Sequence, residues 1–385
     1  MKSFYRLSIL TVFLFLFSES MTESVLSSIC IAVDNAKIKY IFLLLLLIIS
    51  FFQYGKDFLN VEGFKKERQC FACALGILVL TTIYFQFQNG FFSRSIMEVI
   101  YIITPFIFAS VVIKNCGDHI GGFLDTVFCF CIFAVIFNGI TRFTSFGDIN
   151  FVESYSPFES ALSSVFVYFE IYYLYKGDRK KALIAAFLCF LSLKRFSVIK
   201  AVLIYLVFSR TRWKKINPLL LWSTVAFFIV LPFILHAFYS GWGIAYLENY
   251  FQKNIRELTM DRSDRAAIVI WGIEQVNYGL GTTLYLLGLY LREGVGAAEK
   301  SVLSLHCDIL RIFYEGTIVS TIVYTISYFK MIFNRNLYVY LIMLHLFTEA
   351  IVNHFMIGAG ATIQWLIIYM CIYAINTRER EQELY

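Results

Sequence analysis

The stretch IKYIFLLLLLIISFFQY (residues 38–54) contains one charged residue, Lys39, in a run long enough to cross a lipid bilayer. A hydrocarbon core about 30 Å thick needs roughly 17 to 25 helical residues. The rest of the chain has the same character, because 59% of its 385 residues are apolar and 16% are charged, against about a quarter charged in soluble domains. The sequence therefore predicts an all-α polytopic integral membrane protein, with residues 1–385 forming a single membrane domain.

Similar apolar runs recur along the chain between short clusters of charge. The runs with the length of a span are 4–20, 38–54, 71–88, 96–113, 121–140, 159–175, 218–236, 316–333, 337–356 and 359–375. The segment 182–209 differs, because basic loops flank it on both sides and its roughly 28 residues are too few for two full crossings. We expect two short helices there that meet at 192–197. The total becomes about twelve crossings.

The basic clusters also predict which loops share a side of the membrane. Cytoplasmic loops are enriched in Lys and Arg, which places 55–69, Lys114, 176–181, 210–215, Arg335 and both termini in the cytoplasm. A cleaved signal peptide is the alternative for the first span. The periplasmic side receives 141–160 and a long loop, 237–315, that contains amphipathic helices. The net charge of +6 lies in these clusters, so it does not indicate nucleic-acid binding.

The end of the long loop, LHCDILRIFYEG (305–316), carries four ionisable residues in an apolar setting. At roughly 100° per residue, Asp308, Arg311 and Glu315 share one face of a helix. We expect Asp308 to be the N-cap of this helix and His306 to lie in the turn before it. Spacing alone favours a cap and an Asp308–Arg311 ion pair, although ionisable groups at membrane depth are functional candidates.

The same loop contains RELTMDRSDRAAIVIW (256–271), in which arginines alternate with acidic residues. A solvated charged face is the simpler interpretation, but the positive-inside bias removes Lys and Arg from outer segments. The guanidinium fork suits two-point contact with phosphate. Arg195, at the turn between the two short helices, therefore forms with Arg265 and Arg311 a candidate set for a pyrophosphate at the outer leaflet.

One further polar stripe lies inside a predicted span. His345, Glu349 and Asn353 recur every four residues, with His354 adjacent. Residues at this spacing share one face of a helix. The stripe is either a hydrogen-bonding seam between helices or the wall of a substrate chamber, and the spacing does not decide between them.

The order of these motifs resembles the bacterial O-antigen and capsule polysaccharide polymerases of the Wzy type, which share a superfamily with the O-antigen ligases. The segments that carry the resemblance are LSLKRFSVIKAVL (191–203), DRSDRAAIVIW (261–271), NYGLGTTLYL (277–286) and LHCDILRIFYEGTIVS (305–320). Two positions depart from the family pattern. Cys307 stands where Asn is usual, and Tyr278 stands where Pro often precedes the glycines.

Carried over residue by residue, the resemblance implies catalytic roles for Arg195, Arg265, His306 and Asp308. It implies substrate-binding roles for Arg142, Lys194, Arg311 and Glu315. Arg142 belongs to NGITRFTSFGD (138–148), which is similar to the other functional outer loop of the family. We expect the arginines to hold a pyrophosphate, His306 to orient or deprotonate an acceptor hydroxyl with help from Asp308, and Glu315 to anchor Arg311.

The implied activity is glycosyl transfer between two undecaprenyl-diphosphate-linked oligosaccharides at the periplasmic face of the bacterial inner membrane. The expected partners are these lipid-linked substrates, membrane lipid, a chain-length regulator and a flippase, and we expect no metal, cofactor or nucleic acid. Whether the product is O-antigen or capsule stays open.

Two other activities remain as alternatives. An O-antigen ligase differs mainly in its acceptor, the lipid A core. A lipid-linked oligosaccharide flippase would place its charges along a cavity within the spans and keep its loops short, and the 237–315 loop argues against that activity.

Overall fold

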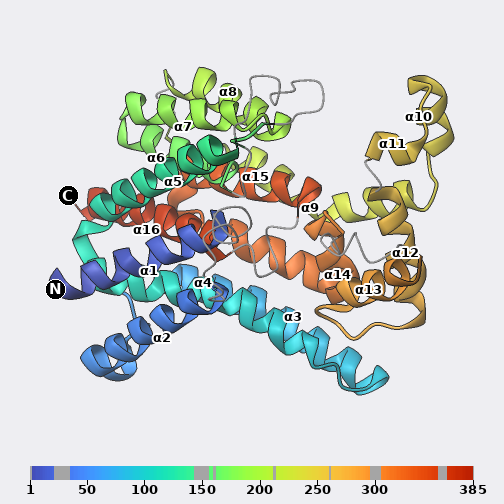
Figure 1. Cartoon of the computed structure of the whole chain (residues 1–385), viewed down its shortest axis with the longest axis horizontal. Helices are drawn as coiled ribbons and strands as arrows, with labels where there is room; N and C mark the ends of the chain where they lie inside the picture. The colour runs from blue at the N-terminus through green and yellow to red at the C-terminus, as the bar shows by residue number, and fades with distance from the viewer. Residues whose placement is uncertain are drawn as a thin grey trace.

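The computed structural model describes residues 2–20, 35–142, 156–158, 162–210, 214–259, 262–294, 305–353 and 362–384. These residues form helices joined by turns and short 3₁₀ segments (Figure 1). The helices are α1 Lys2–Ser20, α2 Asn35–Tyr54, α3 Lys65–Asn89, α4 Arg94–Cys116, α5 Ile120–Arg142, α6 Val165–Lys176, α7 Arg179–Leu191, α8 Arg195–Phe208, α9 Pro218–Tyr239, α10 Ile244–Phe251, α11 Ile255–Thr259, α12 Arg262–Gln275, α13 Thr282–Gly294, α14 Asp308–Phe329, α15 Leu337–Val352 and α16 Thr362–Leu384.

Six of the described helical segments are long and apolar enough to cross a membrane: Tyr40–Asp57, Lys65–Asn89, Arg94–Cys116, Ile120–Phe137, Pro218–Tyr239 and Asp308–Phe329. This length and composition support the predicted all-α membrane protein. Two shorter apolar helices are also present, Phe4–Leu16 and Leu337–Val352. The finer prediction of about twelve crossings goes beyond these helices. In the run 159–175, expected as a full span, the described residues form the 12-residue helix α6, which ends at Lys176 and is about 18 Å long.

The segment 182–209, which is too short for two full crossings, folds into two short helices, α7 and α8, joined by a turn at 192–194. Leu193 takes a positive φ of 53° there, a backbone conformation that residues other than Gly seldom adopt. Ser156 Oγ donates a hydrogen bond of 2.6 Å to the Leu191 carbonyl at the end of α7. The turn is therefore held from outside as well as by its own backbone.

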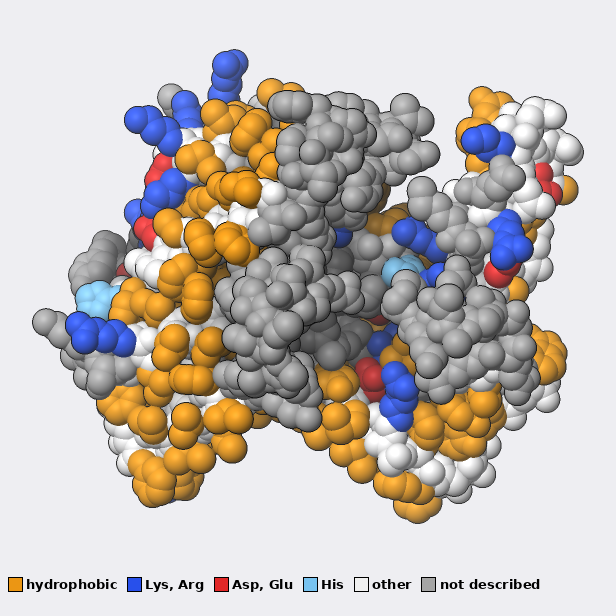
Figure 2. Space-filling view, in the orientation of Figure 1, with side chains coloured by type: hydrophobic (Ala, Val, Ile, Leu, Met, Phe, Trp, Pro, Cys, Tyr) orange, Lys and Arg blue, Asp and Glu red, His pale blue; other side chains and the backbone are white. Residues whose placement is uncertain are grey.

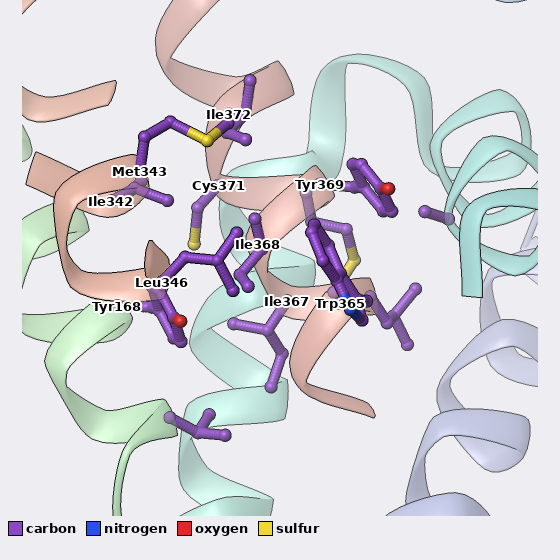
Figure 3. Packing of buried hydrophobic residues seen from close by; sticks show 14 of the residues in the cluster. Tyr168, Ile342, Met343, Leu346, Trp365, Ile367, Ile368, Tyr369, Cys371 and Ile372 are labelled. Carbon is purple, nitrogen blue, oxygen red and sulfur yellow. The ribbon is translucent and has the colours of Figure 1, made fainter. Parts of the chain in front are cut away.

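The helices α6, α15 and α16 form one part of the core. Every residue from Val165 to Leu174 on α6 is buried, and α6 packs against α7, α8, α15 and α16. Figure 3 shows Tyr168 from α6 beside Leu346 of α15 and Ile367 of α16. Tyr168, Leu346 and Ile367 are fully buried. A helix enclosed on all sides is apolar all round, which fits the buried residues Val165–Leu174 of α6 except Glu170.

Contacts gather the predicted cytoplasmic loops at one end of the molecule. Lys114 Nζ donates to the Asn60 carbonyl at 2.9 Å, which joins two of these segments. The C-terminal part of α16 lies beside the start of α3, where Arg380 contacts the buried Glu67 at 2.9 Å. Figure 1 shows both chain termini at this end. The segments that the charge rule assigned to one side therefore lie together.

The loop before α9 and the loop before α15 meet at the same end. Ile216 N–H donates to the Arg335 carbonyl at 2.9 Å, and Leu337 N–H donates to the Lys214 carbonyl at 2.8 Å. This isolated antiparallel bridge makes α9 and α15 start at one level. Figure 2 shows Lys and Arg side chains at this end and hydrophobic side chains over much of the visible surface between the two ends. We call the end of the molecule where these loops meet the basic end.

Candidate functional site

Three helix ends meet away from the basic end: the start of α8, the start of α14 and the end of α15. Their chain directions require this placement. The segment 214–216, which follows α8 and precedes α9, lies at the basic end, and α15 starts there. The Asp308 N–H lies 3.4 Å from the Asn353 carbonyl, so α14 starts where α15 ends. The structure thus brings together positions more than 100 residues apart in sequence, since α8 begins at Arg195 and α14 at Asp308.

Glu349 links α8 to α15. Its carboxylate accepts a hydrogen bond from Ser197 Oγ at 3.2 Å, forms an ion pair with Lys200, and accepts from Asn353 Nδ2 at 2.6 Å. Glu349 is 1% exposed. A charge buried this deeply requires a partner, and Lys200 provides it.

His345, on the same stripe, contacts α6 through its Nε2, 3.0 Å from the Ser164 carbonyl. The contacts of His345, Glu349 and Asn353 match a hydrogen-bonding seam between helices. This is the first of the two interpretations that the spacing left open.

Arg195 is the first residue of α8. It precedes by two residues Ser197, which contacts Glu349 of the seam. Its side chain is exposed, and Lys194 before it is half-buried. α8 has 14 residues, which is about 21 Å of helix against a hydrocarbon core of about 30 Å. Because α8 ends near the basic end, Arg195 at its other end lies about 21 Å from that end.

The start of α14 differs in one detail from the expectation. Asp308 is the first helical residue, and the N-cap position is Cys307, which makes no side-chain cap bond. The Asp308 carboxylate therefore lies in the first turn, where the helix dipole favours a negative charge. His306 precedes it with a positive φ of 51° and is half-buried. Burial raises the pKa of the Cys307 thiol to about 12, so this cysteine is a protonated packing residue.

Arg311 lies deeper, between two carboxylates. Its Nη2 contacts Glu98 of α4 at 2.9 Å, and its Nε contacts Glu315 at 3.2 Å. Arg311 is 4% exposed, Glu98 2% and Glu315 0%. Glu315 also accepts from the Thr283 N–H at 3.0 Å and from its hydroxyl at 2.5 Å. The expected Arg311–Glu315 contact is present, within a buried network that joins α4, α13 and α14.

The glycine segment 277–283 is docked against α3 and α4. A Cβ at Gly279 would lie 2.5 Å from Thr82 Cα, and Gly279 has a φ of +83°. Leu280 N–H donates to Thr82 Oγ1 at 3.1 Å, and Ser95 Oγ donates to the Leu280 carbonyl at 2.6 Å. Glycine is required for this close approach. The segment is a packing element that presents Thr283 to Glu315.

Arg265 lies on α12, which packs against α9 and α13. It is half-buried, one turn after Arg262. The charge of Arg262 acts on the Cys307 thiol and on the Tyr239 hydroxyl, so the first turn of α12 lies near the start of α14. Figure 2 shows a histidine and several Lys or Arg side chains together where this region meets the bundle.

The predicted residues therefore form two neighbouring groups. The outer group contains Lys194, Arg195, His306 and Asp308, which lie at the starts of α8 and α14, and Arg265 on the neighbouring α12. The inner group contains Arg311 and Glu315. The Arg142 side chain and most of the predicted outer loop 141–160 lie outside the described residues, as does His354.

Sequence reasoning missed the partner of Arg311 in the inner group and the partner of Glu349 in the α15 seam. Glu98, which contacts Arg311, is an acidic residue inside a predicted span. Lys200, which contacts Glu349, is a basic residue inside the apolar run 182–209. A lone charge within an apolar run signals that a partner exists, but not which residue it is.

Comparisons with known proteins add no further identification. No family model matches the chain, and a search of curated proteins found no significant relative.

Proposed function

We propose that the chain is a polysaccharide polymerase that joins undecaprenyl-diphosphate-linked repeat units by glycosyl transfer at the outer face of a bacterial inner membrane. The observation that supports it is the meeting of α8, α14 and α15 at the end opposite the basic loops. An exposed arginine, a half-buried histidine and a buried aspartate lie on those helix ends. A cationic cluster on the outer side of a membrane protein opposes the usual charge bias, which indicates a function.

The reaction requires little more than placement and charge. The acceptor hydroxyl oxygen forms a bond to the anomeric carbon of the donor sugar, and the bond from that carbon to the diphosphate oxygen breaks. The diphosphate leaves with the electron pair, and the hydroxyl proton passes to a base. Arg195 and Arg265 stabilise the charge that develops on the diphosphate. His306 receives or directs the proton, and Asp308 holds its position.

Arg311 has a different role within this proposal. Two buried carboxylates already balance its charge, so a third anion would meet an excess of negative groups. Arg311 and Glu315 therefore act as positioning residues. They hold the first turn of α14, and with it His306 and Asp308, against α4 and α13.

The test is polymerisation by purified protein supplied with its lipid-linked repeat unit, read as a ladder of products. Arg195→Ala and His306→Ala should each lower the rate by about 100-fold, the usual cost of one transition-state contact. Arg195→Lys should recover only part of the rate, because an ammonium lacks the two-point fork. Lys253→Ala is the matched control, since Lys253 is an exposed cation in the connection between α9 and α14, which also contains His306. Full activity in both Arg195→Ala and His306→Ala contradicts the assignment.

The ligase alternative differs from the polymerase in its acceptor. A ligase would transfer the glycan to lipid A core and would leave the lipid-linked repeat unextended in the same assay. The flippase alternative requires charges along an open cavity. The buried charges within the bundle at Lys200 and Glu349 contact each other, so this observation does not favour it.

A further inference from the structure

A small cavity opens at the basic end, away from the proposed glycosyl-transfer site. It has a volume of about 90 Å³ and is lined by Tyr175, Lys214, Asn336, Tyr338, Arg378 and Glu379. These residues come from the end of α6, the segment before α9, the start of α15 and the end of α16. One water needs about 10–15 Å³ of such volume, so the cavity has room for a group of phosphate size.

Asn336 gives the cavity a donor with a defined direction. Its Oδ1 caps α15 by accepting from the N–H groups of Tyr338 at 2.9 Å and Val339 at 3.2 Å. The cap settles which end of the amide is oxygen, because only oxygen accepts. Nδ2 is buried, and no hydrogen-bond partner for it occurs among the described residues. An unsatisfied buried donor is costly, and Asn336 is one of the residues that line the cavity, so an acceptor bound there could relieve this cost.

The charges around the cavity favour an anion. Lys214 and Arg378 are both exposed at its rim, against one carboxylate, Glu379. That carboxylate accepts from the Tyr175 hydroxyl at 3.3 Å. The guanidinium of Arg378 lies 5.8 Å from the centre of the Tyr175 ring, which keeps this cation beside the opening. Two cations and a directed amide donor form a binding site for a phosphate group.

The position of the cavity favours a lipid as the source of that phosphate. Lys214 precedes by four residues the apolar helix α9, which starts at Pro218. On α16, Ile375 is fully buried, and Arg378 follows three residues later. Both cations thus lie where apolar helix gives way to polar chain, which is the level of phospholipid headgroups.

We propose that this cavity binds the phosphate of an anionic phospholipid headgroup. The lipid bridges the ends of α6, α9, α15 and α16 through Lys214, Asn336 and Arg378. This site is separate from glycosyl transfer and does not depend on that assignment.

The experiment measures binding of phosphatidylglycerol and phosphatidylcholine to the purified full-length protein in detergent by native mass spectrometry. Asn336→Asp keeps an oxygen for the helix cap but replaces the donor with a negative charge. It should weaken phosphatidylglycerol binding at least tenfold, and Arg378→Gln should weaken it about fivefold. Asn336→Ser, which caps without supplying the amide donor, is the second variant if Asn336→Asp folds poorly.

Lys180→Gln is the matched control, because Lys180 is an exposed cation at the same end that does not line the cavity. Its binding should be unchanged. An equal loss in Lys180→Gln overturns the proposal in favour of general surface attraction. Unchanged binding in both Asn336 variants and Arg378→Gln means that water alone fills the cavity. Competition by inorganic phosphate at concentrations comparable to the lipid overturns the lipid source and assigns free phosphate.

Discussion

Arg311 is a buried cation whose replacement should lower the stability of the protein as well as its activity. Glu98 and Glu315 both contact it. Arg311→Gln would therefore leave two carboxylates buried without their counter-charge, a change that costs about 3–5 kcal/mol. We expect a marked fall in the melting temperature of the purified protein, together with loss of activity.

Arg195→Gln provides the contrast, because Arg195 is exposed. It should lower activity at an almost unchanged melting temperature. Adding Glu98→Gln to Arg311→Gln should restore part of the lost stability, since residues in direct contact are coupled. An Arg311→Gln protein as stable as the parent but inactive would indicate that Arg311 binds the pyrophosphate and does not act by holding α14 in place.

The 277–283 segment carries the corresponding prediction at the scale of an element. In Gly279→Ala the new methyl group would lie 2.5 Å from Thr82 Cα, at a φ of +83°. Strain and overpacking together should cost about 2–4 kcal/mol. The segment would have to move away from α3, which breaks the Leu280–Thr82 hydrogen bond and shifts Thr283 from Glu315. The melting temperature of the purified variant measures this effect.

Gly288→Ala is the matched control on α13. No atom lies within 4 Å of a Cβ there, and alanine favours a helix over glycine by up to about 1 kcal/mol. This variant should be as stable as the parent or slightly more stable. Equal stability of Gly279→Ala and the parent would mean that the segment is not docked against α3 as described.

Local sequence patterns predicted the elements well, and failed where contacts span long separations. The basic loops on both sides of 182–209 predicted α7 and α8. The Arg311–Glu315 contact was expected from the family resemblance, whereas spacing alone favoured an Asp308–Arg311 pair. Neither spacing nor periodicity encodes that Glu98 lies beside Arg311 or that Lys200 lies beside Glu349, because those pairs depend on how helices pack. The glycine segment was expected only as part of an outer loop, although tertiary packing buries it against α3.

At the scale of the whole molecule, the contacts predict one membrane orientation for all the basic loops. Lys114 and Asn60, Arg380 and Glu67, and Lys214 and Leu337 join these loops at one end. The positive-inside bias predicts that this end is cytoplasmic. That prediction puts the connection after α9 outside, which is a condition for the proposed reaction.

Introduced cysteines test this orientation in a background where Cys30 and the exposed Cys73 and Cys129 are replaced by Ser. Glu62→Cys and Lys180→Cys, both exposed at the basic end, should react with a membrane-impermeant maleimide only after the inner membrane is permeabilised. Lys253→Cys, which is exposed in the connection after α9, should react in spheroplasts with an intact membrane. Labelling of Lys253→Cys only after permeabilisation would place Arg195 and His306 out of reach of a periplasmic glycan, and would exclude the proposed polymerisation even if both residues proved essential.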